Sequence, residues 1–150
     1  MKGWGSVSAA IFLCAGIAGA DLVDARAVSV LCPPCIMPTT SEESDAFNSL
    51  MWDLQACNDS SCLAIGNAMG SISFSYVDDD WSCTWHSSGC SGENFNDGTA
   101  WISRSGGDGT GQNAIDGAII AAHEAGHSAF NTSDDFIVES QLNYCLSLIG

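Results

Sequence analysis

The chain has 150 residues, of which 18 are Asp or Glu and only three are Lys or Arg, so its formal net charge at pH 7 is −15. A nucleic-acid-binding protein needs a basic surface, and three cations cannot supply one. Nucleic acids and anionic membrane surfaces are therefore excluded as electrostatic partners. Hydrophobic residues make up 46% of the chain, which argues against disorder and favours one folded domain.

Residues 1–20 have the pattern of a secretory signal peptide. Lys2 precedes an apolar run over 7–17, and Ala18-Gly19-Ala20 is a small-residue cleavage pattern. The sequence therefore predicts export to the extracellular space or the periplasm, with residues 21–150 as a single mature domain. No membrane contact is expected after cleavage, because no other stretch approaches the roughly 20 apolar residues of a membrane span.

Most cysteines of the mature chain are expected to be paired, because an oxidising compartment favours disulfides. Spacing suggests three close pairs, although sequence alone does not determine connectivity. Cys145 is then left over, and it is a free thiol, the partner of a cysteine in another chain, or a residue whose pairing breaks this scheme. The three suggested pairs are Cys32–Cys35, Cys57–Cys62 and Cys83–Cys90.

Two regular elements are predicted in the first half of the mature chain. A helix over 40–54 is indicated by the capping box of Thr40 and Glu43 and by apolar residues at helical spacing after it. Residues 72–76 alternate between apolar side chains and serines, which predicts a half-buried strand. The Trp-, Cys-, Gly- and Asn-rich stretch over 81–98 is expected to be a loop region.

Residues 113–130 are predicted to form a helix that contains His-Glu-Ala-Gly-His, an instance of the pattern His-Glu-x-x-His. Residues four apart share one face of a helix, so His123 and His127 present two imidazoles to one point, which suits Zn²⁺. Glu124 is offset by about 100° and is expected to act as general base on a zinc-bound water. The alternative is a pair of surface histidines with a solvated glutamate.

With this motif on a helix, the region from Thr99 to Cys145 resembles the zincin metallopeptidases. The resemblance implies a zinc-dependent enzyme that hydrolyses peptide bonds in protein or peptide substrates. It also implies that the short strand predicted over 99–103 is the edge strand that lies above the cleft and pairs with the substrate backbone.

The third zinc ligand has several candidates. The metzincin pattern would continue to a glycine and a third histidine, but this sequence has Phe130 and Ser133 at those positions. Asp134 and Asp135 follow one and two residues later and are candidate ligands of a degenerate metzincin. The same two carboxylates are also typical of the start of a helix, where they meet its positive end.

Glu139 is the preferred third ligand. A final helix is predicted over 134–148, and the short connection 131–133 favours an antiparallel hairpin with the motif helix. Counted from the turn, Glu139 is then about as far along its helix as the two histidines are along theirs. This resembles the gluzincin plan, in which a glutamate on a following helix completes the site. The alternative for Glu139 is an exposed helical residue.

Two further residues are weaker candidates. His86 can be a metal ligand, a donor to the transition state or a surface residue. Tyr144 can polarise a substrate carbonyl or be part of the core.

Together these patterns predict an α+β fold: a small disulfide-containing domain with a motif-bearing active-site helix, a short edge strand before it and an antiparallel C-terminal helix. The predicted function is that of a secreted zinc metallopeptidase. The alternative is a non-catalytic secreted structural or adhesion module with a structural or vestigial metal site, because the chain is short for a secreted protease. A cleft in which Glu124 is accessible would favour the enzyme.

Overall fold

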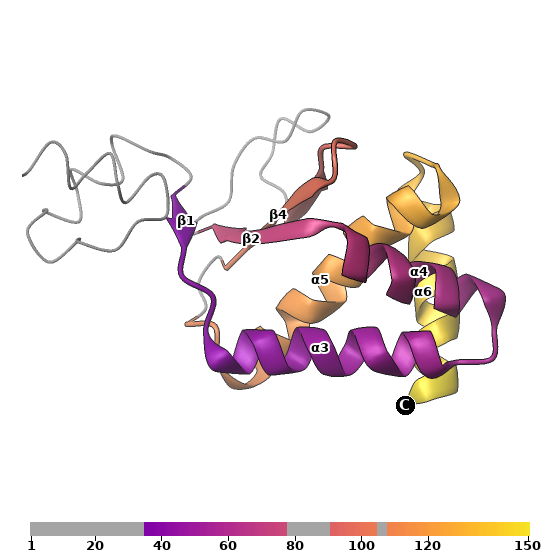
Figure 1. Cartoon of the computed structure of the whole chain (residues 1–150), viewed down its shortest axis with the longest axis horizontal. Helices are drawn as coiled ribbons and strands as arrows, with labels where there is room; N and C mark the ends of the chain where they lie inside the picture. Colours follow the sequence, from indigo (N-terminus) through magenta and orange to yellow (C-terminus); the bar gives the residue numbers. More distant parts are fainter. Residues whose placement is uncertain (1–34, 78–90, 105–107) are drawn as a thin grey trace, which may run out of the picture.

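The computed structural model describes residues 35–77, 91–104 and 108–150. The predictions of a signal peptide over 1–20, of a role for His86 and of a Cys83–Cys90 pair concern residues outside these ranges. None of the helices within the described ranges combines the length and apolar character needed to cross a membrane. In chain order the elements are β1 (Ile36–Met37), α3 (Ser41–Ala56), α4 (Ser60–Ser71), β2 (Ser73–Val77), β3 (Gly92–Asn94), β4 (Thr99–Ser103), α5 (Gly111–Phe130) and α6 (Asp135–Ile149) (Figure 1).

The first two helices begin at side-chain caps. The predicted capping box of α3 is confirmed: Thr40 accepts a hydrogen bond from the backbone of Glu43, whose carboxylate accepts one from the backbone of Thr40. Helix α4 was not predicted. It begins where the Asp59 carboxylate accepts hydrogen bonds from the backbone N–H groups of Ser61 and Cys62.

The four strands form one mixed sheet in the order β1-β2-β4-β3. Strand β4 is parallel to β2 on one side and antiparallel to β3 on the other. The prediction that residues 99–103 form an edge strand is therefore wrong. The strand on the outer side of β4 in the described sheet is β3. Its three residues belong to the stretch over 81–98 that was expected to be a loop.

Helix α5 packs against both the sheet and α6 through glycines. A Cβ atom on Gly117 would lie 2.9 Å from Cε1 of Tyr76 in β2, and one on Gly126 would lie 2.5 Å from Cγ1 of Val138 in α6. The chain turns back from α5 into α6 (Figure 1), but the antiparallel hairpin stays a prediction. Larger side chains of the core come from α3, α4, β4 and α6, including Leu54, Ile65, Met69, Ile102 and Leu142.

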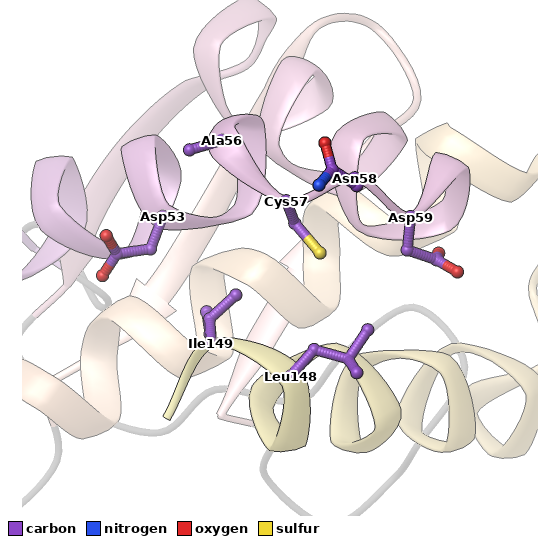
Figure 2. A pocket seen from close by; sticks show the side chains of 7 residues that line it. All are labelled: Asp53, Ala56, Cys57, Asn58, Asp59, Leu148 and Ile149. Carbon is purple, nitrogen blue, oxygen red and sulfur yellow. The ribbon is translucent and has the colours of Figure 1, made fainter.

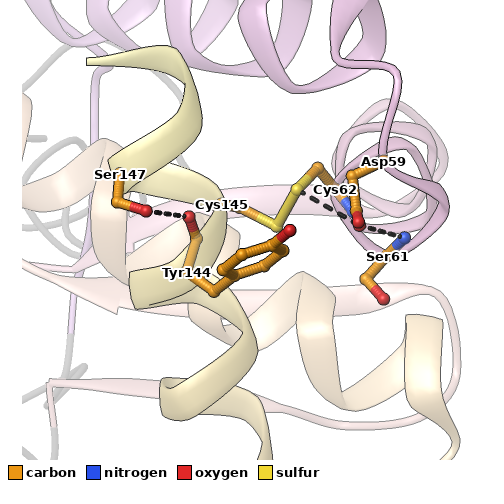
Figure 3. Close-up of a disulfide and its surroundings, with 6 residues drawn as sticks. All are labelled: Asp59, Ser61, Cys62, Tyr144, Cys145 and Ser147. Carbon is orange, nitrogen blue, oxygen red and sulfur yellow. Dashed lines mark hydrogen bonds between the residues drawn. A yellow bond between two sulfur atoms is a disulfide. The ribbon is translucent and has the colours of Figure 1, made fainter.

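A disulfide between Cys62 and Cys145 joins α4 to α6 (Figure 3). The α+β class and the presence of a disulfide are thus confirmed, but the expected Cys57–Cys62 pair is wrong. Cys145 is also neither a spare thiol nor available to another chain. Cys57 is the free cysteine among the described residues. Cys35 is disulfide-bonded too, and the predicted Cys32–Cys35 pair includes Cys32, which lies outside the described residues.

The end of β4 is tied to the start of α3 by a buried ion pair. Arg104 donates to both carboxylate oxygens of Glu43 and to the carbonyl of Pro38. The side chains of Arg104 and Glu43 are 9% and 1% exposed. Since Arg104 is the one Lys or Arg within the described ranges, the rest of that surface carries no permanent positive charge.

Candidate metal and catalytic site

Helix α5 brings the motif side chains together as its spacing predicts. His123, Glu124 and His127 each offer a ligand atom, and these three atoms all lie within 4.8 Å of one another. The two imidazole rings are partly accessible, with the side chain of His123 25% exposed and that of His127 13% exposed. Two nitrogens therefore approach one point that solvent can reach.

The end of α5 orients the ring of His127. Asn131 adopts a left-handed conformation at φ 48° and ψ 50°, which ends the helix and reverses the chain. The backbone N–H of Thr132 then bonds the carbonyl of His127, while the Nδ1–H of His127 donates to the carbonyl of Thr132 at 2.9 Å. Because Nδ1 carries the proton of this hydrogen bond, Nε2 of the neutral ring is left with a lone pair.

The two aspartates at the start of α6 have different roles. Asp134 caps the helix, since its carboxylate accepts hydrogen bonds from the N–H groups of Phe136 and Ile137. Asp135 instead faces the histidines: its Oδ1 lies 3.1 Å from Nε2 of His127 and 3.4 Å from Nε2 of His123. Of the candidate third ligands within the described ranges, Asp135 is thus the one that contacts both rings.

The donor set fits a zinc ion. Nε2 of His127 and Oδ1 of Asp135 lie at hydrogen-bond distance, so a proton on Nε2 or a metal ion between the two atoms satisfies both of them. Tetrahedral zinc with bonds of about 2.0–2.1 Å to nitrogen and oxygen holds neighbouring ligand atoms about 3.3 Å apart. The observed separations of 3.1 and 3.4 Å match that edge. His123, His127 and Asp135 would hold such an ion.

Glu124 lies beside this group but is mostly enclosed. Its side chain lines a cleft that also contains the two histidines, although the residue is only 6% exposed. Burial raises the pKa of Glu124 to about 7; the charges of Asp135 and Glu93 add to the rise, and a hydrogen bond from the backbone of Asn94 opposes it. A carboxyl group with a pKa near 7 can both accept and release a proton at neutral pH, as general acid–base catalysis requires.

A cleft of about 1140 Å³ runs past these residues, between β3 and the start of α6. Glu139 lines the cleft too, but within the described part of the chain it forms no hydrogen bond or ion pair with either histidine. Its predicted role as third ligand stays a prediction, and the contacts favour Asp135. Tyr144 does not line the cleft and lies beside the Cys62–Cys145 disulfide instead (Figure 3).

Asn94 is a site residue that sequence reasoning missed. Its amide donates to the backbone carbonyl of Glu124 and to the hydroxyl of Ser128, both at 2.7 Å. It thereby attaches the edge strand β3 to the motif turn of α5. The sequence holds no signal for this contact, because it depends on how the sheet lies over the helix.

We expect Gly92→Ala to lower the free energy of unfolding by about 1–3 kcal/mol, the usual cost of overpacking. A Cβ there would lie 2.5 Å from Oε1 of Glu124 and 2.7 Å from Cγ2 of Ile120. Urea denaturation measures the change. The matched control is Gly70→Ala, whose nearest neighbour would be Sδ of Met51 at 3.5 Å. This helical variant should be as stable as the parent or up to about 1 kcal/mol more stable. Equal stability of Gly92→Ala would show that β3 does not lie against α5.

The other polar groupings of the described residues do not form a comparable site. Asp59 lies close to Cys62 and Cys145, but both sulfurs are in the disulfide and the carboxylate caps α4. A smaller cavity of about 480 Å³ contains the Cys57 thiol, between the α3–α4 turn and the last residues of α6 (Figure 2). It is lined by Asp53, Ala56, Cys57, Asn58, Asp59, Leu148 and Ile149.

Comparison of the chain with protein-family models, with curated proteins and with solved structures found no match. The function therefore has to be inferred from the geometry of the cleft.

Proposed function

We propose that the protein is a zinc-dependent peptidase that hydrolyses peptide bonds in exported or extracellular substrates. The observation that carries the proposal is the position of the Asp135 carboxylate, within 3.1 and 3.4 Å of the Nε2 atoms of His127 and His123. Two neutral imidazoles and one carboxylate form the three-ligand set that leaves a catalytic zinc with an open position. The adjacent Glu124 adds the group that a peptidase needs for proton transfer.

The proposed mechanism assigns one role to each group. A bound zinc ion would polarise the substrate carbonyl and lower the pKa of a coordinated water. Glu124 accepts the proton of the attacking water and then releases it to the leaving amine; the burial that raises its pKa favours the protonated form between these two steps. The carbonyl of Thr132 holds His127 in the tautomer whose Nε2 faces the cleft.

Strand β3 is the proposed binding edge for the substrate backbone. It is the last strand of the sheet in the described part of the chain, and Gly92, Glu93 and Asn94 all line the cleft. An extended peptide can add to such an edge by main-chain hydrogen bonds. This role was predicted for residues 99–103, which the sheet order places one strand further in.

The alternative is a non-catalytic secreted module with a structural metal site. The burial of Glu124, at 6% exposure and with a hydrogen bond from the Asn94 backbone, favours this alternative. The same enclosure also raises the pKa of Glu124 to the range of a general base, so hydrolysis has to be measured directly.

Export is part of the proposal. The disulfide between Cys62 and Cys145 supports it, because such bonds persist in oxidising compartments. The cleavage pattern at Ala18-Gly19-Ala20 supports it independently.

Metal analysis of the folded protein tests the proposal. We expect about one zinc per chain, and loss of hydrolysis when a chelator removes the metal. Asp135→Asn should weaken zinc binding by more than about a hundredfold, since loss of an outer-shell partner alone costs 10- to 100-fold. Glu139→Gln is the matched control and should bind zinc like the parent protein. If Glu139→Gln weakens zinc binding and Asp135→Asn does not, Glu139 is the ligand. A folded protein that takes up no zinc would rule out the enzyme.

A further inference from the structure

One residue of strand β3 holds the proposed general base at both of its ends. The side-chain amide of Asn94 donates to the backbone carbonyl of Glu124 at 2.7 Å, and the backbone N–H of Asn94 donates to the Glu124 carboxylate. The same side-chain amide also donates to the hydroxyl of Ser128 at 2.7 Å. Asn94 thereby spans one turn of α5, from Glu124 to the residue four positions later on the same face.

These contacts determine where the carboxylate of Glu124 can lie. A glutamate side chain has three rotatable bonds, and on an open helix surface it samples several rotamers. Here the strand lies directly over the carboxylate, since a Cβ on Gly92 would be 2.5 Å from Oε1 of Glu124. The ligand atoms of Glu124, His123 and His127 lie within 4.8 Å of one another. The strand therefore restricts Glu124 to a conformation beside the two histidines.

Asn94 is itself held in place by its neighbours in the sheet. It lies opposite Ala100 in the pairing of β3 with β4, and its Oδ1 accepts a hydrogen bond from the backbone N–H of Asn96 at 2.8 Å. With these contacts both the nitrogen and the oxygen of the side-chain amide are bonded, so the amide has one favourable orientation. It forms a rigid link between the sheet and the motif turn of α5.

We infer that Asn94 is a positioning residue for hydrolysis, which holds the Glu124 carboxylate where it can reach the attacking water. The inference rests on the proposed function, because it takes Glu124 as the general base. Asn94 acts through Glu124 and neither transfers a proton nor binds the metal. A misplacement of about 1 Å can lower a rate by a hundredfold, so loss of this link should reduce kcat and leave substrate binding intact.

Kinetics of zinc-loaded variants test the inference. Asn94→Ala removes the side-chain amide and keeps the backbone of β3. We expect its kcat to be about ten- to a hundredfold below that of the parent protein, with KM and zinc affinity unchanged within about a factor of two. The matched control is Asn67→Ala, at an exposed position of α4 outside the cleft, which should keep the kcat of the parent.

Ser128 separates positioning from a general loss of structure, because its side chain is exposed and its replacement leaves the core intact. Ser128→Ala removes one acceptor of the Asn94 amide and should lower kcat about threefold, the effect of one ordinary hydrogen bond. Ser128→Thr keeps the hydroxyl and should restore kcat. Adding Ser128→Ala to Asn94→Ala should lower kcat no further, since the hydroxyl acts only through the amide.

Nuclear magnetic resonance gives a readout that needs no turnover. Ser128→Ala should shift the side-chain amide signals of Asn94, and Glu124→Gln should shift its backbone N–H signal, whereas the signals of Asn67 should stay in place. Unshifted Asn94 signals would overturn the inference. So would the kcat of the parent in Asn94→Ala, or a loss of kcat that only follows a loss of bound zinc. Failure of the proposed function looks different: the zinc-loaded parent would hydrolyse no peptide, and the inference would fall with it.

Discussion

Glu124→Gln is expected to keep its zinc and to lose peptide hydrolysis by a factor of roughly 10²–10⁴, the usual contribution of a general base. The amide has nearly the shape of the carboxylate but cannot accept the proton of the attacking water. The three proposed metal ligands are unchanged, so the metal content should be as well. The measurement is kcat/KM on a peptide substrate, beside elemental analysis of the same sample.

Two controls make this loss interpretable. Burial disfavours the charged form of Glu124, so its neutral replacement should not lower the free energy of unfolding. Asp45→Asn removes one negative charge from an exposed position of α3 and should leave kcat/KM unchanged. Full activity of Glu124→Gln would contradict the proton-transfer role. Loss of zinc from that variant would instead show that Glu124 is itself a ligand.

Replacing both Cys62 and Cys145 by alanine is expected to lower the free energy of unfolding by about 4.5 kcal/mol. The two residues are 83 apart in sequence, and a crosslink that closes a loop of this length removes that much chain entropy from the unfolded state. Urea denaturation at 25 °C measures the effect. A loss below about 1 kcal/mol would show that the crosslink restricts the unfolded chain little.

Cys57→Ser is the matched control for the disulfide. Cys57 is partly buried and free, so this variant removes a thiol without removing a crosslink, and we expect it to cost less than about 1 kcal/mol. The site should also respond to loss of the disulfide, because α6 carries both Asp135 and Cys145. Zinc affinity of the double variant should fall even under conditions where it stays folded.

The local signals in the sequence were sufficient to predict helices α3, α5 and α6. The capping box at Thr40 and Glu43, the apolar spacing of the motif helix and the aspartates at the start of α6 all act within one turn. Helix α4 was missed although Asp59 caps it and its buried residues have helical spacing. The sequence analysis expected a Cys57–Cys62 pair here and predicted no helix between that pair and the strand over 72–76.

Strand β3 and the Cys62–Cys145 disulfide could not be predicted from such local signals. Residues 92–94 are Gly-Glu-Asn, which have no strand preference, and they form a strand because β4 supplies the hydrogen-bonding partner. Cys62 and Cys145 meet only after α4 and α6 have packed. Both features depend on contacts between residues far apart in the chain.

One part of the candidate site also follows from local sequence signals, and the other part depends on how α5 and α6 pack. The two histidines and Glu124 follow from helical spacing alone, so the sequence predicts their grouping. The choice between Asp135 and Glu139 depends on the left-handed Asn131 and on which aspartate caps α6. Counting residues along an assumed antiparallel hairpin favoured Glu139. In the structure the turn over 131–134 places Asp135, the first residue of α6, against both imidazoles.

If a peptide pairs with β3 as proposed, the position of this strand determines which of the peptide's side chains can be recognised. A peptide that pairs with this edge points alternate side chains to opposite faces, so only every second residue faces the wall formed by α6. A shift of one residue along the edge would reverse that pattern completely. The Asn94 amide joins β3 to the turn of α5 that carries the motif, so the position of this strand relative to the histidines is fixed. The set of peptide side chains that would face α6 is then fixed as well.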